Sequence, residues 1–237
     1  MSEYPAPNPG KRLEISLENE TWKRWPIRTP VIGPDSNLPE ILQERTKGLR
    51  QADDLLIVAE SVVAISQGRA YRMDDIQPTR MASLLSRFVR KVPWGIGLGK
   101  PQTMQLAIEE CGLFRILCAA LAGGMGKAVG VGGLFYRLAG PQARLIDGPC
   151  ANTLPPYNEY ATLGPRAPQA AAKALSQALG VCLAIVDAND LGTHCIGAYP
   201  KRHLAWKTSR LAESLTQDNP GGQSREQTPV ILGRMSS

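Results

Sequence analysis

The chain has 237 residues, of which 43% are hydrophobic and 20% are charged, and this composition is ordinary for a globular protein with a substantial buried core. Its length allows one large domain or two small ones. The formal net charge is +6, which bears on association and solubility more than on fold and therefore excludes no fold class.

The positive charge is concentrated in the middle third of the chain. Residues 76–146 contain nine Lys or Arg residues but only two acidic residues, Glu109 and Glu110. Such a stretch either attracts an anion or forms a solvated basic surface.

The cysteines and the most apolar stretch bear on the cellular compartment. The five cysteines are an odd number without a CxxC pair, and no cationic segment followed by an apolar one opens the chain, so we expect the reducing cytoplasm. Residues 114–138 come nearest to a membrane span, but Lys127 interrupts them at a cost of about 3 kcal/mol. We expect two short buried segments hinged at Gly123-Gly124 and no stable membrane insertion.

Taken in order, the chain begins with a proline-rich segment, residues 1–11, which predicts a loose arm. Residues 12–18 alternate apolar and polar side chains, as a half-buried strand does. We therefore assign residues 1–24 to an N-terminal arm and edge strand, and residues 25–237 to the main domain. Helical periodicity and caps predict helices near residues 38–50, 81–89, 102–111, 168–179 and 204–215. Apolar runs predict strands at residues 55–59, 160–163, 181–186 and 230–232.

Two apolar segments end in carboxylates. Residues 181–186 read as a buried strand that is followed by Asp187, Asn189 and Asp190. A shorter run, residues 144–146, is followed by Asp147. If these segments are neighbours in a sheet, their carboxylates converge and supply the oxygen ligands that a hard cation prefers. A plain turn explains the same residue types.

Two glycine-rich segments precede or contain a lysine. Residues 93–100 place three glycines at alternate positions before Lys100, and residues 123–127 end in Lys127. Glycines allow backbone N–H groups to approach a phosphate. Neither segment matches a phosphate-loop pattern, and close helix packing through small residues explains the second as well.

Two further features could face a ligand. Glu60 follows the apolar run at residues 55–59, where it either faces a site or is an exposed carboxylate. The tail at residues 218–229 is rich in glycine and polar amides, which favours a ligand-facing loop or a solvated linker.

The order of several motifs resembles the coenzyme F420-0:L-glutamate (γ-glutamyl) ligase family. Asp53-Asp54 precedes a strand, Gly68-Arg69 follows it, and Asp147 and Asp187 stand in Asp-Gly and Val-Asp contexts. The divergent bacterial branch of the family is the closer likeness. Its GxGxGxPxxMQLAI, IDGP, TxPPYNxY, VDxNDLG and NPxGQxxEQTP motifs correspond, without strict identity at every position, to residues 95–108, 146–149, 153–160, 186–192 and 219–229. The resemblance covers roughly residues 25–233.

The resemblance implies an α+β fold, with mixed sheets, packed helices and an intertwined chain, usually as a homodimer. It implies a ligase that uses GTP and Mg²⁺ or Mn²⁺ to join a carboxylate to the amine of glutamate, with no nucleic-acid partner. It assigns the metal to Asp147, Asp187 and Asp190, and it places Gly68 and Arg69 near the nucleotide or the acceptor.

The sequence also departs from the characterised ligases. They carry a Ser-Lys pair in the first strand and Lys-Ala-Glu before Gly-Arg, where this chain has Glu60-Ser61 and Ile65-Ser66-Gln67. We therefore expect altered phosphate recognition, with Lys100, Lys127 or Arg69 as substitutes. A non-catalytic regulatory protein that binds metal or nucleotide on the same fold is the alternative.

Overall fold

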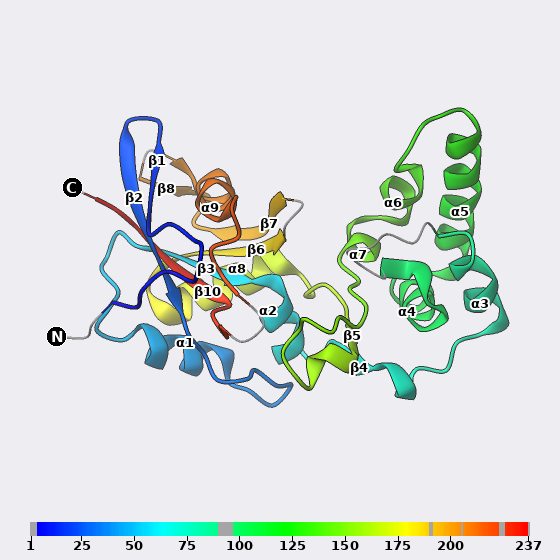
Figure 1. Ribbon diagram of the computed structural model, residues 1–237, viewed down its shortest axis with the longest axis horizontal. Helices are drawn as coiled ribbons and strands as arrows, with labels where there is room; N and C mark the ends of the chain where they lie inside the picture. The colour runs from blue at the N-terminus through cyan, green and yellow to red at the C-terminus, as the bar shows by residue number, and fades with distance from the viewer. Residues whose placement is uncertain (1–3, 90–96, 190–191, 205, 223–225, 237) are drawn as a thin grey trace. The chain divides into compact units, whose positions relative to one another are not determined.

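The computed structural model describes residues 4–89, 97–189, 192–204, 206–222 and 226–236. The chain divides into two compact units: unit 1 is Met1–Gly68 with Pro165–Ser237, and unit 2 is Arg69–Gly164. Figure 1 shows the helices and strands of both units. The boundary expected between residues 24 and 25 falls inside a strand of unit 1, β2 (Glu20–Ile27). The mixture of helices and mixed sheets confirms the expected α+β class.

Unit 1 is built on a mixed sheet of six strands. In spatial order they are β1 (Glu14–Leu17), β2, β10 (Val230–Met235), β3 (Leu55–Ala59), β6 (Cys182–Asn189) and β7 (Gly192–Tyr199). β3 and β6 are parallel, whereas the other neighbouring pairs are antiparallel. The C-terminal strand β10 therefore lies between strands from the first quarter of the chain.

Helices cover both faces of this sheet. Figure 1 shows α9 (Thr208–Thr216) on one face and α1 (Leu38–Thr46) and α8 (Pro168–Leu179) on the other. Leu55 and Ile57 of β3 belong to the apolar cluster that includes Leu211 of α9, so the intervening residues of β3 face the opposite layer. Because both faces are buried, β3 and β6 are continuous apolar runs rather than alternating ones.

Three short elements complete unit 1. The helix α2 (Glu60–Ser66) follows β3 directly. The strands β8 (Arg202–His203) and β9 (Trp206–Lys207) pair with each other ahead of α9.

Unit 2 combines a small sheet with a group of helices. β4 (Ala70–Arg72) pairs with β5 (Tyr160–Thr162) in antiparallel register. The helices are α3 (Arg80–Ser86), α4 (Pro101–Cys111), α5 (Leu113–Ala128), α6 (Leu134–Ala139) and α7 (Pro141–Arg144), with 3₁₀ turns at Met73–Asp75, Gly97–Gly99 and Tyr157–Glu159. Their core contains Leu98, Met104 and Ile116.

Most elements predicted from the sequence are confirmed. The strand at 55–59 and the helix at 168–179 match β3 and α8 at both ends, and Gly180 ends α8 in the left-handed conformation with φ 63°. The strand expected before Asp147 is wrong, because α7 occupies Pro141–Arg144 and Asp147 forms an isolated β-bridge to Thr162.

The hinge expected at Gly123-Gly124 is also wrong. α5 continues through both glycines, and the chain turns between α5 and α6 instead. A Cβ atom on Gly126 would lie 2.6 Å from the carbonyl oxygen of Val131, so glycine there allows the chain to turn back tightly. α5 is buried on one face only: Ile116 and Ala119 lie in the core, whereas Leu121 and Met125 are more than two-thirds exposed. Within the described residues, no helix is both long and apolar enough to cross a membrane.

The N-terminal arm is docked rather than loose. The ring of Tyr4 lies 4.5 Å from that of Trp25, and its hydroxyl donates to the carbonyl of Leu49 at 3.0 Å. The amide of Asn8 donates to the carbonyl of Pro220 and the hydroxyl of Thr228 at 2.9 and 2.8 Å. Composition alone could not predict this docking, because the contacts are with distant residues, and those of Asn8 are more than 200 positions away.

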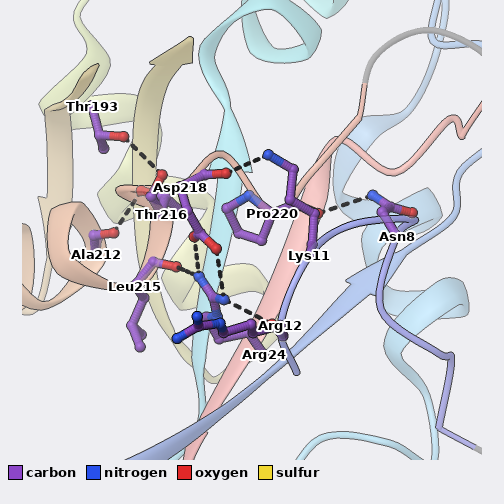
Figure 2. A network of polar contacts seen from close by, with 10 residues as sticks. All are labelled: Asn8, Lys11, Arg12, Arg24, Thr193, Ala212, Leu215, Thr216, Asp218 and Pro220. Carbon is purple, nitrogen blue, oxygen red and sulfur yellow. Dashed lines mark hydrogen bonds and ion pairs between the residues drawn. The ribbon is translucent and has the colours of Figure 1, made fainter. Parts of the chain in front are cut away.

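A buried arginine holds the C-terminal tail against the sheet. Arg24 of β2 is 1% exposed, and its guanidinium donates to both carboxylate oxygens of Asp218 (Figure 2). It also donates to the carbonyls of Leu215 at 2.9 Å and Arg12 at 2.7 Å, while Lys11 donates to the carbonyl of Asp218. The tail therefore begins at a fixed point in unit 1.

A second arginine fixes the last strand. Arg234 of β10 makes a bidentate ion pair with Asp54, through Nε at 2.6 Å and Nη2 at 2.7 Å, and Asp54 is fully buried. The guanidinium carbon of Arg234 lies 5.2 and 5.1 Å from the ring centroids of Tyr4 and Trp25. The hydrogen bond to Asp54 raises the pKa of Arg234 further above its usual range.

Asp218→Asn should destabilise the protein by about 1–3 kcal/mol, because it leaves the buried guanidinium of Arg24 without its counter-charge. Burial alone would raise the pKa of Asp218, but its hydrogen bond to Arg24 and the charge of that residue outweigh burial and lower it. The contribution should thus be fully present above the unfolded pKa of about 3.9 and lost as pH falls through the lower folded pKa.

Urea unfolding of the parent, Asp218→Asn and Asp35→Asn at pH 6 and pH 3 measures this effect. Asp35 is an exposed residue of unit 1 and serves as the matched control. Equal stability of all three proteins at pH 6 would show that the ion pair contributes nothing.

Candidate functional site

The stretch around Asp187 lies in two antiparallel neighbouring strands, β6 and β7. The predicted buried strand is confirmed, with residues 182–186 of β6 buried, but Asp187 remains within the strand rather than in a turn. Asp187 is half-buried and pairs in register with His194 of β7. A register shift between Ile185 and Val186 precedes it. Bulges of this kind re-aim side chains and are frequent beside functional sites.

Glu60 follows β3, and Asp187 lies in its parallel neighbour β6. Ala59, the last residue of β3, pairs with Val186 of β6, so the next residue of each chain segment is a carboxylate. Parallel neighbours lie about 4.8 Å apart, and ligands in α/β sheets commonly bind at their carboxyl ends. Glu60 is 7% exposed and begins α2, where the helix N-terminus favours a negative charge. The alternative of an exposed strand-end carboxylate is therefore wrong.

The polar tail reaches the same edge of the sheet. β10 is antiparallel to β3, and the N–H of Ala59 donates to the carbonyl of Pro229 at 2.8 Å. Gly222 and Thr228 close the loop through two backbone hydrogen bonds of 3.2 and 2.7 Å. A Cβ atom on Gly222 would lie 2.8 Å from Cβ of Glu226, so the loop closes tightly only with glycine there. Pro229, at the end of the tail, therefore lies beside Ala59, the residue directly before Glu60.

The three metal ligands expected from the resemblance have different positions in the fold. Asp187 belongs to the six-stranded sheet of unit 1, whereas Asp147 belongs to unit 2 and exchanges two backbone hydrogen bonds of 2.9 Å with Thr162. Asp190 lies outside the described residues. Asp147 and Asp187 are therefore not neighbours in one sheet. Among the described residues there is no group of three or more His, Cys, Asp or Glu side chains arranged to hold a metal ion.

Gly68 and Arg69 have well-defined structural contacts. Gly68 follows α2 with φ +70°, a conformation that glycine adopts readily. Arg69 is 1% exposed, donates through Nε to the carbonyl of Gly164 at 2.6 Å and pairs through Nη2 with Glu110 at 2.7 Å. Its Nη1 is buried without a hydrogen-bond partner in the described structure. That nitrogen is the part of Arg69 that a ligand could still engage.

The two candidate lysines lie in different helices of unit 2, Lys100 at the start of α4 and Lys127 near the end of α5. Lys100 is exposed at the N-cap of α4, where no side chain caps the helix. Lys127 lies in the last turn of α5, and its Nζ donates to the carbonyl of Phe88 at 3.1 Å. An open helix N-terminus with an adjacent cation favours an anion, so Lys100 has the more favourable setting of the two.

One motif of the resemblance has a structural explanation. Met104 and Leu106 of α4 are buried in the core of unit 2. Gln105 accepts hydrogen bonds from the N–H and hydroxyl of Thr79, at 3.0 and 2.9 Å, and so anchors the start of α3. These residues position helices rather than a ligand.

A basic pocket in unit 1 was not predicted from the sequence. It has a volume of about 370 Å³ and is bordered by β7, the β8–β9 pair, the start of α9 and the first turn of α8. Its lining residues are Gln169, Cys195, Ile196, Gly197, Ala198, Lys201, Arg202, Lys207 and Ser209. The available signal was the pairing of Lys201-Arg202 with Lys207 immediately before an amphipathic helix.

Comparison with known proteins bears on the first half of the chain. No curated protein matches the sequence. The model of the F420-0:gamma-glutamyl ligase family matches residues 26–121, a segment that contains β3, Glu60, Arg69 and α4. Residues 26–121 are therefore similar to the F420-0:gamma-glutamyl ligase family, and Asp53-Asp54, Gly68-Arg69 and the motif at residues 95–108 lie within the matched segment.

Proposed function

We propose that the protein is a nucleotide- and metal-dependent ligase that joins a carboxylate of one small molecule to the amine of an amino acid such as glutamate. The match of residues 26–121 to the ligase family carries this proposal. The polar groups at the carboxyl ends of β3 and β6 support it, because they gather carboxylates where parallel strands commonly bind ligands.

The reaction proceeds in two displacements. An oxygen of the acceptor carboxylate attacks the terminal phosphorus of GTP, the bond to the GDP oxygen breaks, and an acyl phosphate forms. The amine of the second substrate then attacks the acyl carbon, phosphate departs with the bonding electrons, and the nitrogen loses a proton. The protein must therefore hold two anions together and neutralise charge on the phosphoryl oxygens.

The metal part of the proposal rests on hard oxygen donors. Glu60 follows β3 and Asp187 lies in the adjacent strand β6, and we add Glu60 to the ligands Asp147, Asp187 and Asp190 that the resemblance implies. Carboxylates are the donors that Mg²⁺ and Mn²⁺ prefer. A bound divalent cation would neutralise phosphoryl charge in both displacements.

The nucleotide part of the proposal rests on unit 2. Arg69 has one buried guanidinium nitrogen left for an acceptor, and Lys100 stands beside the uncapped N-terminus of α4. Lys127 completes the set, and Gly68 provides the turn that leads into Arg69. Since Arg69 also supports Gly164 and Glu110, its substitution would destabilise unit 2, and the lysines are the better probes.

We propose that the protein lies in the cytoplasm and forms a homodimer. All five cysteines are free thiols, which fits a reducing compartment. α5 presents Phe114, Leu121 and Met125 to solvent, at 81%, 70% and 71% exposure. Their spacing puts them on one face of the helix, and a second copy of α5 would cover that face in a symmetric interface.

A phosphate-release assay tests the ligase activity. We expect release from GTP to require Mg²⁺ or Mn²⁺ together with a carboxylate and an amino acid, drawn from a mixed pool. Lys100→Ala and Lys127→Ala should each raise the KM for GTP by about tenfold, whereas the exposed control Lys47→Ala should not.

Two outcomes of the same assay decide against catalysis. Nucleotide binding without turnover for any pair in the pool would favour the non-catalytic regulatory protein. Absence of nucleotide binding, measured by calorimetry, would contradict the ligase and leave only a regulatory protein that binds metal. Unchanged GTP affinity in both lysine variants would reject these two residues as substitutes for the family lysines.

Asp187→Asn and Glu60→Gln should weaken metal binding while leaving the fold intact. At a metal concentration 100-fold above Kd, the melting temperature of the parent should rise by about 5 °C or more. Both variants should show a smaller rise, and metal-free Asp187→Asn should melt above the parent because crowded carboxylates repel one another. Differential scanning calorimetry with and without metal gives these shifts.

Asp35→Asn is the control for the metal measurement, since Asp218→Asn would break the ion pair with Arg24. Equal metal-induced shifts in the parent and Asp187→Asn would mean that Asp187 holds no metal.

The double substitution Leu121→Gln with Met125→Gln should convert the dimer to a monomer, because it removes apolar area from the centre of the proposed interface. Sedimentation velocity of the parent and the variant measures this change. Val31→Gln, at another exposed apolar position, is the control. A parent protein that sediments as a monomer would exclude this assembly.

A further inference from the structure

The basic pocket of unit 1 has a fixed backbone. The hydroxyl of Thr208 donates to the carbonyl of Pro200 at 2.6 Å, and its N–H donates to the carbonyl of Lys201 at 3.1 Å. His203 lies 2.9 Å from the carbonyl of Asp53 through Nε2. These bonds hold the segments that carry Lys201, Arg202 and Lys207 against the start of α9. The pocket is therefore preformed, as small-molecule sites usually are.

The charged side chains that line the pocket are all basic, and the carboxylate of Glu213 behind the wall accepts from the N–H of Cys195 at 2.9 Å. Lys201, Arg202 and Lys207 are exposed side chains that line it, and no carboxylate does. None of these three cations forms an ion pair with another described residue. Three like charges around one hollow repel one another and create a positive potential, which an anion would relieve.

The neutral groups of the lining add hydrogen-bond donors. Lys207 is the N-cap of α9, no side chain caps this helix, and its first turn has no acidic residue. The N–H groups of the first turn have no acceptor within the helix. That of Thr208 donates to the carbonyl of Lys201, which leaves those of Ser209 and Arg210 for a ligand. The hydroxyl of Ser209 lines the pocket beside them. Several donors next to a helix N-terminus suit the oxygens of a phosphate.

The remaining lining residues are apolar, or their polar groups already form hydrogen bonds within the protein. Gln169 exchanges two hydrogen bonds with the backbone of Ala198, at 2.6 and 3.2 Å, so its amide closes the edge of β7. Burial raises the pKa of the Cys195 thiol to about 12, so it is a neutral wall rather than a nucleophile. Together with Ile196, these residues would contact an uncharged part of the ligand.

The geometry points to a second ligand site here, one that binds an organic phosphate: the phosphate lies between the three cations and the start of α9, and the organic part lies on the wall formed by β7. The volume of about 370 Å³ is in the range of pockets for small organic molecules and exceeds the needs of inorganic phosphate. This site lies wholly in unit 1 and does not depend on the proposed ligase activity.

Calorimetric titration of the full chain with ribose 5-phosphate tests the site. EDTA is present throughout, so that no metal site contributes, and ribose, inorganic phosphate and glutamate are titrated in parallel. We expect saturable binding of ribose 5-phosphate, weaker binding of inorganic phosphate, and no binding of ribose or glutamate. Arg202→Gln combined with Lys207→Gln should weaken the affinity by about tenfold or more.

Arg28→Gln combined with Lys47→Gln is the matched control, because it removes the same charge from exposed positions of unit 1. It should change the affinity by less than about twofold, since distant surface charges are screened by salt. Amide NMR shifts at Gly197, Ser209 and Arg210 on adding ribose 5-phosphate would locate the ligand.

Three results would overturn the assignment. One is equal weakening in the pocket variant and the control, which would indicate a general electrostatic effect. Another is glutamate binding as tightly as ribose 5-phosphate, which would replace phosphate recognition with carboxylate recognition. The third is the absence of saturable binding by the parent.

Discussion

The central position of β10 is the constraint on which unit 1 depends. The pair β1–β2 and the group β3–β6–β7 are joined in the sheet through this C-terminal strand. Its Arg234 makes a bidentate ion pair with the buried Asp54 at the start of β3 and lies against Tyr4 and Trp25. A buried carboxylate is costly unless it is paired, so the sheet and the N-terminal arm form together with the last strand.

The same constraint fixes the candidate site. The tail that leads into β10 begins at Asp218, which Arg24 holds, and ends at Pro229, which accepts a hydrogen bond from Ala59. Glu60 follows Ala59, and Asp187 follows the residue paired with it. Contacts that stabilise the fold therefore also place the end of the tail beside the residue directly before Glu60. Substitutions at these anchors should change stability and ligand binding together.

Local patterns predicted the elements but not which strands are neighbours. The caps of α8 and the apolar run of β3 are local signals, and both elements were predicted to the residue. The proximity of Asp147 to Asp187 was inferred from two similar strand ends, whereas the register pairs Ala59 with Val186, the residues directly before Glu60 and Asp187. A usable signal existed, because the runs before Glu60 and Asp187 are five and six apolar residues long, as in strands buried on both faces. The run before Asp147 is shorter and belongs to no strand.

The density of Lys and Arg along the sequence did not predict which of these side chains remain unpaired, because many of them gain hydrogen-bond partners on folding. In the basic stretch, Arg115 donates to the carbonyl of Leu138 at 2.8 Å and Lys127 to that of Phe88, and the acidic Glu110 is engaged by Arg69. Lys201 and Lys207 come from a segment that composition did not distinguish, yet they line a pocket without a described carboxylate partner. An anion site thus depends on which Lys and Arg side chains remain unpaired on a fixed backbone. These side chains can be identified only when the pairing of the strands is known.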